Sequence, residues 1–172
     1  YLPHMDVLRL ASWASEKGIR LVIDESFVDF ASEFPDNTLL KNDILERYPD
    51  MIVVKSISKS FGVPGLRLGI MASADTELIA FIKKDVSIWN LNSFAEFFMQ
   101  IYTKHEADYR KAAGKFMAER ARFKALLDEI PFLKIFDSES NYFLCEVLPP
   151  YTSHGLAVSL LKNHNILIKD CS

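Results

Sequence analysis

A lysine, an arginine and two serines stand close together in the stretch SISKSFGVPGLRLG, residues 56–69. Ser56 and Ser58 precede Lys59, and Arg67 follows eight positions after the lysine. An arginine fork and serine hydroxyls suit the oxygens of a phosphate, whereas a lysine amine can act as both nucleophile and base. The stretch therefore predicts a site in which a phosphate is held beside a reactive amine.

A second polar cluster, DESF at residues 24–27, follows the apolar run LVI. Ligands of an open parallel sheet sit outside the carboxyl ends of its strands, so this cluster and the SISKS segment are expected to face one crevice. A carboxylate, an amine, two hydroxyls and a guanidinium together suit a ligand with a basic ring nitrogen, a carbonyl and a phosphate. Pyridoxal phosphate has all three.

The composition favours an ordinary folded protein of one domain or two small lobes, because 49% of its 172 residues are hydrophobic and 25% are charged. A net charge of −3 gives no general electrostatic reason to expect nucleic acid or a membrane surface as partner. The two cysteines match no disulfide framework, which favours a reducing compartment such as the cytoplasm. The four histidines show no metal-ligand spacing, so no metal site is expected.

Hydrophobic periodicity predicts an α/β order of elements, with two buried strands that favour a largely parallel sheet. Gly18 is expected to end the first helix, and Ser73 is expected to cap the helix over 73–85. Gly114 is expected to interrupt the long helical stretch over 93–130. The expected elements are a helix over 4–17, strands over 19–24 and 50–56, a helix over 73–85, a helix pair over 93–130, strands over 132–136 and 141–147, a helix over 153–163 and a strand over 166–170.

The segments VIDESFVDF and VVKSISKSFGVPGLRLG resemble the fold-type I pyridoxal-phosphate aminotransferases, most closely the group of histidinol-phosphate aminotransferase and threonine-phosphate decarboxylase. The resemblance extends to SNYFLCEV and ILIKDCS near the end of the chain. It implies a three-layer αβα arrangement with a mostly parallel sheet for residues 1–105, as the C-terminal part of a cofactor-binding large domain. Residues 106–172 would form a small, incomplete α+β domain. It further implies a homodimeric parent whose N-terminal half and extreme C-terminus lie outside this sequence.

The resemblance also implies a role for each member of the polar clusters. Lys59 would form the Schiff base with the cofactor aldehyde and then move the substrate proton. Asp24 would pair with the pyridine nitrogen, while Ser56, Ser58 and Arg67 would bind the phosphate. Without these neighbours, each residue also has an ordinary interpretation as a solvated lysine, a turn aspartate or a structural ion pair.

Three further residues are implied at the site. Ser26 would lie against one face of the cofactor ring, and Asn141 would approach the substrate. Phe27 departs from the tyrosine that aminotransferases of this group usually carry, whereas the phosphothreonine decarboxylases tolerate phenylalanine there.

The predicted function is amino-group transfer between an amino acid or amino-phosphate compound and a 2-oxo acid. A decarboxylase of the threonine-phosphate type is the alternative, and a catalytically incomplete, non-enzymatic fragment is a second one. A nucleotide-binding phosphate loop is excluded, because its glycines precede the lysine, whereas Gly62 and Gly65 follow Lys59.

Overall fold

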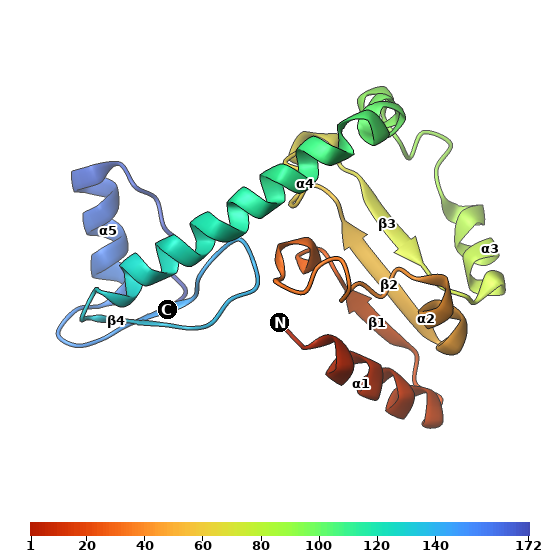
Figure 1. The fold of residues 1–172 in the computed structure, drawn as a ribbon, viewed down its shortest axis with the longest axis horizontal. Helices are drawn as coiled ribbons and strands as arrows, with labels where there is room; N and C mark the ends of the chain where they lie inside the picture. Colours follow the sequence, from red (N-terminus) through yellow and green to blue (C-terminus); the bar gives the residue numbers. More distant parts are fainter. The chain divides into compact units, whose positions relative to one another are not determined.

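Two units make up the chain in the computed structural model, which describes residues 1–172 (Figure 1). The first unit comprises Tyr1–Lys115 and the second Phe116–Ser172. The first contains α1 (His4–Glu16), β1 (Leu21–Asp24), η1 (Val28–Phe30), α2 (Asn42–Arg47), β2 (Met51–Ser56), η2 (Pro64–Leu66), β3 (Gly69–Ala72), α3 (Thr76–Asp85) and most of α4 (Ser93–Asp128).

The sheet of the first unit has the order β1-β2-β3. β1 and β2 are parallel, with Asp24 opposite Val54, which confirms the predicted parallel pair. β3 runs antiparallel to β2, with Gly69 opposite Ser56. β3 was not predicted from the sequence, because its four residues carry no alternating pattern.

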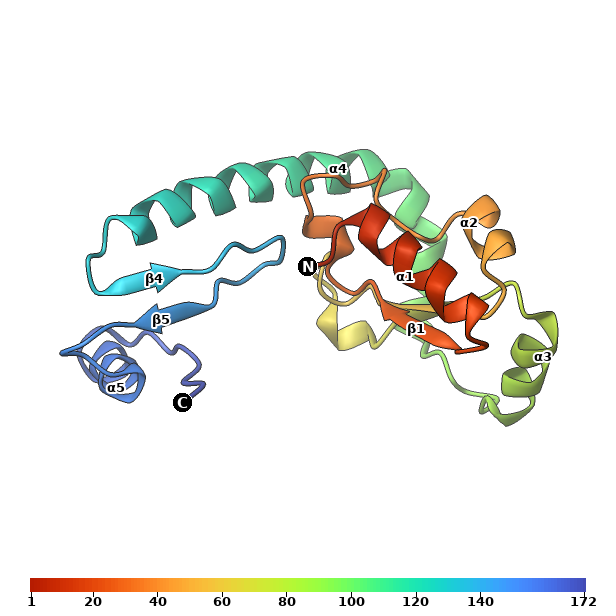
Figure 2. The same cartoon turned by 90° about the horizontal axis from the view of Figure 1, so that it is seen from below.

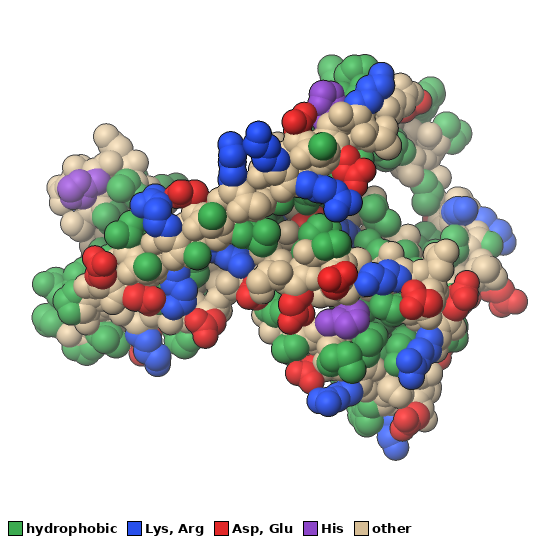
Figure 3. All heavy atoms as spheres, in the orientation of Figure 1, with side chains coloured by type: hydrophobic (Ala, Val, Ile, Leu, Met, Phe, Trp, Pro, Cys, Tyr) green, Lys and Arg blue, Asp and Glu red, His purple; other side chains and the backbone are tan.

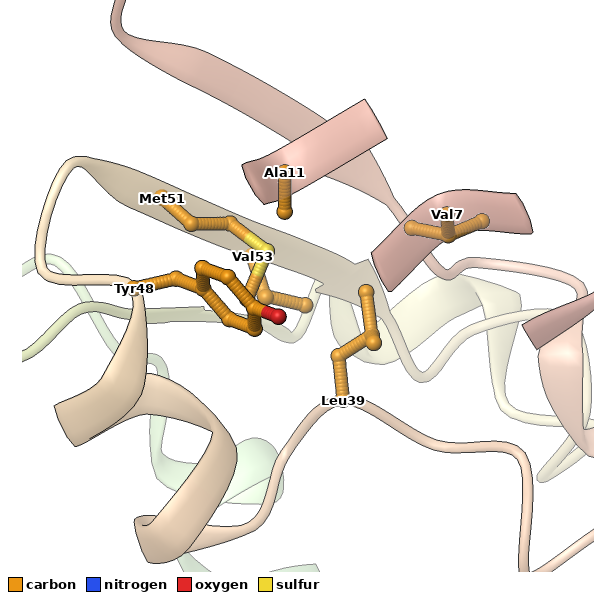
Figure 4. Packing of buried hydrophobic residues seen from close by; sticks show 6 residues of the cluster. All are labelled: Val7, Ala11, Leu39, Tyr48, Met51 and Val53. Carbon is orange, nitrogen blue, oxygen red and sulfur yellow. The ribbon is translucent and has the colours of Figure 1, made fainter. Parts of the chain in front are cut away.

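A hydrophobic core joins α1 and α2 to one face of β2 (Figure 4). Val7 and Ala11 of α1 point toward Met51 and Val53 of β2, and Tyr48 and Leu39 close the cluster. Leu21 and Ile23 of β1 pack against the same cluster, which explains why both strands were recognisable as apolar runs.

Strand alternation divides the side chains of β1 and β2 between two faces. Met51, Val53 and Lys55 point to the face covered by α1, and all three are buried. Asp24, Val54 and Ser56 belong to the opposite face. The candidate site residues of the two strands therefore share the face that α1 does not cover.

Two predictions about the helices of the first unit were wrong in detail. Asp75, not Ser73, caps α3: its carboxylate accepts a hydrogen bond from the Leu78 amide at 2.9 Å. α4 is one helix of 36 residues with no break at Gly114 (Figure 2). A single glycine costs a helix only about 1 kcal/mol relative to alanine, and a helix of this length tolerates that cost.

The second unit consists of the end of α4, the antiparallel pair β4 (Leu133–Ile135) and β5 (Cys145–Val147), and α5 (Ser153–His164). The predicted strands and helix are confirmed here, although both strands are shorter than expected. The Thr152 hydroxyl caps α5 by accepting from the Gly155 amide at 3.1 Å. The predicted strand over 166–170 is not formed, because no neighbouring strand pairs with it.

Basic and acidic side chains are interspersed on the face seen in Figure 3, with no large area of one sign. None of the helices is long and apolar enough to cross a lipid bilayer.

Candidate functional site

Asp24, the last residue of β1, has an exposed carboxylate that is oriented by hydrogen bonds to one of its two oxygens. Its Oδ1 accepts hydrogen bonds from the Ser26 amide at 2.8 Å and from the Ser26 hydroxyl at 2.5 Å. These two bonds fix the plane of the carboxylate and leave Oδ2 free to accept a further proton or hydrogen bond.

Ser26 connects the ends of two neighbouring strands. Its buried hydroxyl donates to Asp24 and accepts a hydrogen bond from the Ser56 amide at 3.0 Å. One hydroxyl therefore links the carboxylate of Asp24 to the backbone of Ser56 at the ends of β1 and β2. The structure thus brings together three of the predicted site residues, Asp24, Ser26 and Ser56.

Lys59 lies in the turn that follows β2, with its side chain exposed. The turn is closed by backbone hydrogen bonds from Phe61 to Ile57 at 3.2 Å and from Gly62 to Lys59 at 3.3 Å. The neighbouring Ser58 is buried, and its hydroxyl makes no hydrogen bond in this structure. An unpaired buried hydroxyl is costly, which makes Ser58 a candidate to bind an external acceptor.

Arg67 returns to the end of β2 through a tight loop. Gly62 has φ +65° and Arg67 itself has φ +56°, both in the left-handed region. The Ile57 amide donates to the Leu68 carbonyl at 3.3 Å. This bond joins the residue after Arg67 to the residue between Ser56 and Ser58. The exposed guanidinium contacts only the carbonyl of Pro64, at 3.3 Å, and is available to an anion.

The remaining two predicted residues are placed differently. Phe27 is half-buried and lies 6.4 Å from Phe30, measured between ring centroids. Asn141 belongs to the second unit, where its side-chain oxygen accepts a hydrogen bond from Ser140 at 3.5 Å.

A buried ion pair, which was not predicted from the sequence, lies beside the lysine turn. Lys55 donates to Asp29 Oδ1 at 2.5 Å, and the two side chains are 8% and 1% exposed. The Ser60 hydroxyl donates to the other oxygen, Asp29 Oδ2, also at 2.5 Å. The signal was present in the sequence, because a lysine within the apolar strand MIVVKS requires a buried partner of opposite charge.

Aromatic rings of α4 pack against this turn. The rings of Phe61 and Tyr109 are stacked, with centroids 4.4 Å apart and planes 2° from parallel. Phe98 and Tyr102 lie edge-on to Phe61 at 6.4 and 5.2 Å. Burial, together with the negative charge of Asp29, raises the pKa of Tyr109 above its usual value.

The chain belongs to the aminotransferase class I and II family, whose sequence profile matches residues 1–172. It is 32% identical over 171 residues to CMP-5'-(3-aminopropyl)phosphonate synthase of Streptomyces rubellomurinus, covering 99% of this chain and 27% of that protein. It is 30% identical over 153 residues to L-serine phosphate decarboxylase of Sulfurospirillum multivorans, covering 87% of this chain and 39% of that enzyme.

The fold is also that of solved structures of the family. The structure of histidinol-phosphate aminotransferase from Clostridium acetobutylicum superposes with a TM-score of 0.84 at 28% identity, over 95% of this chain and 48% of that one. This similarity confirms the predicted α/β fold class. The chain thus spans less than half the length of each of these three relatives.

Enzymes of this family depend on pyridoxal phosphate. The first unit contains groups suited to each part of that cofactor: a carboxylate with a free oxygen, an exposed amine, an unpaired buried hydroxyl and an exposed guanidinium. They belong to Asp24, Lys59, Ser58 and Arg67. These residues fit the cofactor.

Proposed function

We propose that the protein containing this chain is a pyridoxal-phosphate-dependent aminotransferase, which moves an amino group between an amino acid or amino-phosphate compound and a 2-oxo acid. The observation that carries the proposal is the connection of Asp24 to Ser56 through the Ser26 hydroxyl. It fixes a group suited to the ring nitrogen relative to the segment suited to the phosphate.

The bound cofactor would act as an electron sink for the carbanion formed at the substrate. Asp24 Oδ2 would hold the proton on the ring nitrogen, and the two bonds from Ser26 would keep that oxygen in place. Arg67 and the hydroxyls of Ser56 and Ser58 would bind the phosphate as donors. The exposed amine of Lys59 would attach the cofactor and carry the proton at the substrate carbon.

The same proposal extends to the wider assembly. Residues 1–105 would belong to the large, cofactor-binding domain and residues 106–172 to the small domain. Ser26 and Phe27 would contact the cofactor, and Asn141 would approach the substrate. The protein would act as a homodimer on a small molecule, with neither nucleic acid nor membrane as partner.

Decarboxylation of a phosphorylated amino acid is the second candidate, and Phe27 favours it. Phenylalanine has no hydroxyl to donate to the 3-oxygen of the cofactor, and the ring lies beside Phe30 in an apolar setting. A relative of 30% identity is named as an L-serine phosphate decarboxylase, which is consistent with this alternative.

Product analysis on the full-length protein tests both candidates. The protein is incubated with pyridoxal phosphate and a panel of amino acids and their phosphate esters, with and without a 2-oxo acid. Amino exchange that requires the 2-oxo acid would support the aminotransferase, whereas release of carbon dioxide without it would support the decarboxylase.

Borohydride reduction followed by peptide mapping should place the cofactor on Lys59, and Lys59→Ala should abolish both the label and the activity. A label on any other residue would contradict the assignment.

A further inference from the structure

We infer that the buried Asp29 carboxylate positions Lys59 by holding closed the turn that carries this lysine. The inference rests on the proposed function of Lys59 and adds three residues to the site: Asp29, Ser60 and Tyr109. None of them was predicted from the sequence.

The two oxygens of Asp29 hold the two ends of one short segment. Oδ1 accepts from Lys55, which lies inside β2, and Oδ2 accepts from Ser60, one residue after Lys59. The segment between these two anchors is Ser56–Lys59 and therefore contains both candidate phosphate-binding serines and the lysine. One carboxylate thus sets the span of the turn.

Asp29 is itself held firmly. It lies in η1 with its side chain 1% exposed, and the ion pair with Lys55 ties it to a strand of the sheet. Its position therefore follows that of β2. The hydrogen bond to Asp29 holds Ser60 in position, so the turn is attached to the sheet through Asp29 and Lys55.

The far side of the turn is held by α4. The stacked pair of Phe61 and Tyr109 fixes the residue after Ser60, and burial, together with the charge of Asp29, raises the pKa of the Tyr109 hydroxyl. Ser58 is buried, Ser60 is bound and Phe61 is stacked, whereas Lys59 is exposed. The lysine amine is the part of the turn that is left free to reach a ligand.

A purely stabilising role explains this arrangement poorly. A buried ion pair contributes little net stability compared with well-packed apolar side chains of similar volume, because both charges must be desolvated. The additional hydrogen bond that Ser60 donates to Asp29 stabilises one position of the backbone at Lys59. Such a bond is useful where a reacting group must be held within a fraction of an ångström.

Replacement of Ser60 tests the inference without breaking the ion pair. In Ser60→Ala the bond to Asp29 Oδ2 is lost, whereas Ser60→Thr retains a hydroxyl. Ser87→Ala, at an exposed serine, is the matched control. Two quantities are measured on the full-length protein: hydrogen exchange of the Phe61 and Gly62 amides without cofactor, and the rate at which borohydride traps the cofactor on Lys59.

The Ser60→Ala variant should exchange these two amides about tenfold faster, the change that corresponds to about 1.4 kcal/mol. It should also trap the cofactor more slowly, and Ser60→Thr should restore both values. Unchanged exchange in Ser60→Ala would overturn the inference whatever the trapping shows. Faster exchange with unaltered trapping would overturn it as well, since the bond would then serve the fold alone. If wild-type protein attached no cofactor at Lys59, the proposed function itself would fail, which the wild-type sample alone reveals.

Discussion

Ser26 and Asp24 form a local unit in which one serine supplies two hydrogen bonds to a single carboxylate oxygen, from its amide at 2.8 Å and from its hydroxyl at 2.5 Å. The same hydroxyl accepts from the Ser56 amide. The unit therefore couples the orientation of an exposed carboxylate to the end of the next strand.

Ser26→Ala should impair both stability and cofactor binding. The change removes one bond to Asp24 and leaves the Ser56 amide unpaired, which should cost about 1–3 kcal/mol of unfolding free energy. Asp24→Asn should weaken cofactor binding with a much smaller effect on stability, because Asp24 is exposed. Urea unfolding of the cofactor-free proteins and titration with pyridoxal phosphate separate the two effects. Equal loss of stability in both variants would contradict this division of roles.

The ion pair of Lys55 with Asp29 predicts a strong asymmetry between single and double substitutions. Lys55→Met leaves a carboxylate buried without its charged partner and should lower the unfolding free energy by about 3–5 kcal/mol. Lys55→Met combined with Asp29→Leu should recover most of that loss, because neither charge then has to be desolvated. Chemical denaturation measures both values.

The control for this experiment is the exposed ion pair of Arg110 with Glu106 on α4. Arg110→Ala should leave the unfolding free energy almost unchanged, since solvent screens exposed charges. A double variant as unstable as Lys55→Met alone would show that the pair is not the source of the effect.

Tyr109 predicts a loss of stability in alkaline solution. Burial, and next the charge of Asp29, raise the pKa of Tyr109 in the folded protein above the usual value of 10.0. The unfolded protein therefore loses the tyrosine proton first, so stability is full below pH 10 and falls as the pH rises toward the folded value. The decline is at most about 1.4 kcal/mol per pH unit for one proton. Burial of Tyr102 acts in the same direction.

Tyr109→Phe should make this alkaline decline shallower, because phenylalanine has no proton to lose. The measurement is the urea midpoint between pH 8 and pH 11, and Tyr151→Phe, at an exposed tyrosine of the second unit, is the control. The same slope in Tyr109→Phe and wild type would contradict the assignment of the effect to Tyr109.

The sequence was sufficient for elements whose signals are local. The helical spacing of α1, the apolar runs of β1 and β2, and the helix α5 were all read from neighbouring residues. β3 has only four residues and depends on pairing with β2, so it carried no signal of its own. Residues 166–170 have the composition of a strand but no strand beside them.

The candidate site shows the same limit. Asp24, Ser56, Ser58, Lys59 and Arg67 could be named because they stand in two short segments whose order is distinctive. Asp29 and Lys55 are 26 residues apart, and Tyr109 is distant from both, so their association depends on how η1, β2 and α4 pack. Tertiary packing, not local pattern, decides which side chains support the lysine.

Gly114 tests the finding that α4 is continuous. An added Cβ at this exposed position would meet nothing within 4 Å, so Gly114→Ala should stabilise the helix by about 0.5–1 kcal/mol. Gly155→Ala in α5 is the contrasting control, because its Cβ would lie 3.0 Å from the hydroxyl of Thr152 that caps the helix. Thermal unfolding should show the two substitutions moving in opposite directions. A loss of stability in Gly114→Ala would indicate a bend at this residue.

Gly62 and Gly65 form a matched pair for the loop that leads from Lys59 to Arg67. A Cβ at either position would enter open space, but only Gly62 has a positive φ, at +65°. Gly62→Ala should therefore cost about 1–2 kcal/mol of stability, whereas Gly65→Ala should change little. The Gly62 amide also donates to the Lys59 carbonyl, so strain at Gly62 should slow attachment of the cofactor to Lys59. The unfolding free energy and the trapping rate are measured in both variants. Because neither added Cβ meets another atom, a difference between the variants reports the backbone conformation at Gly62 and not steric crowding. Equal values in Gly62→Ala and Gly65→Ala would show that the left-handed conformation is not required.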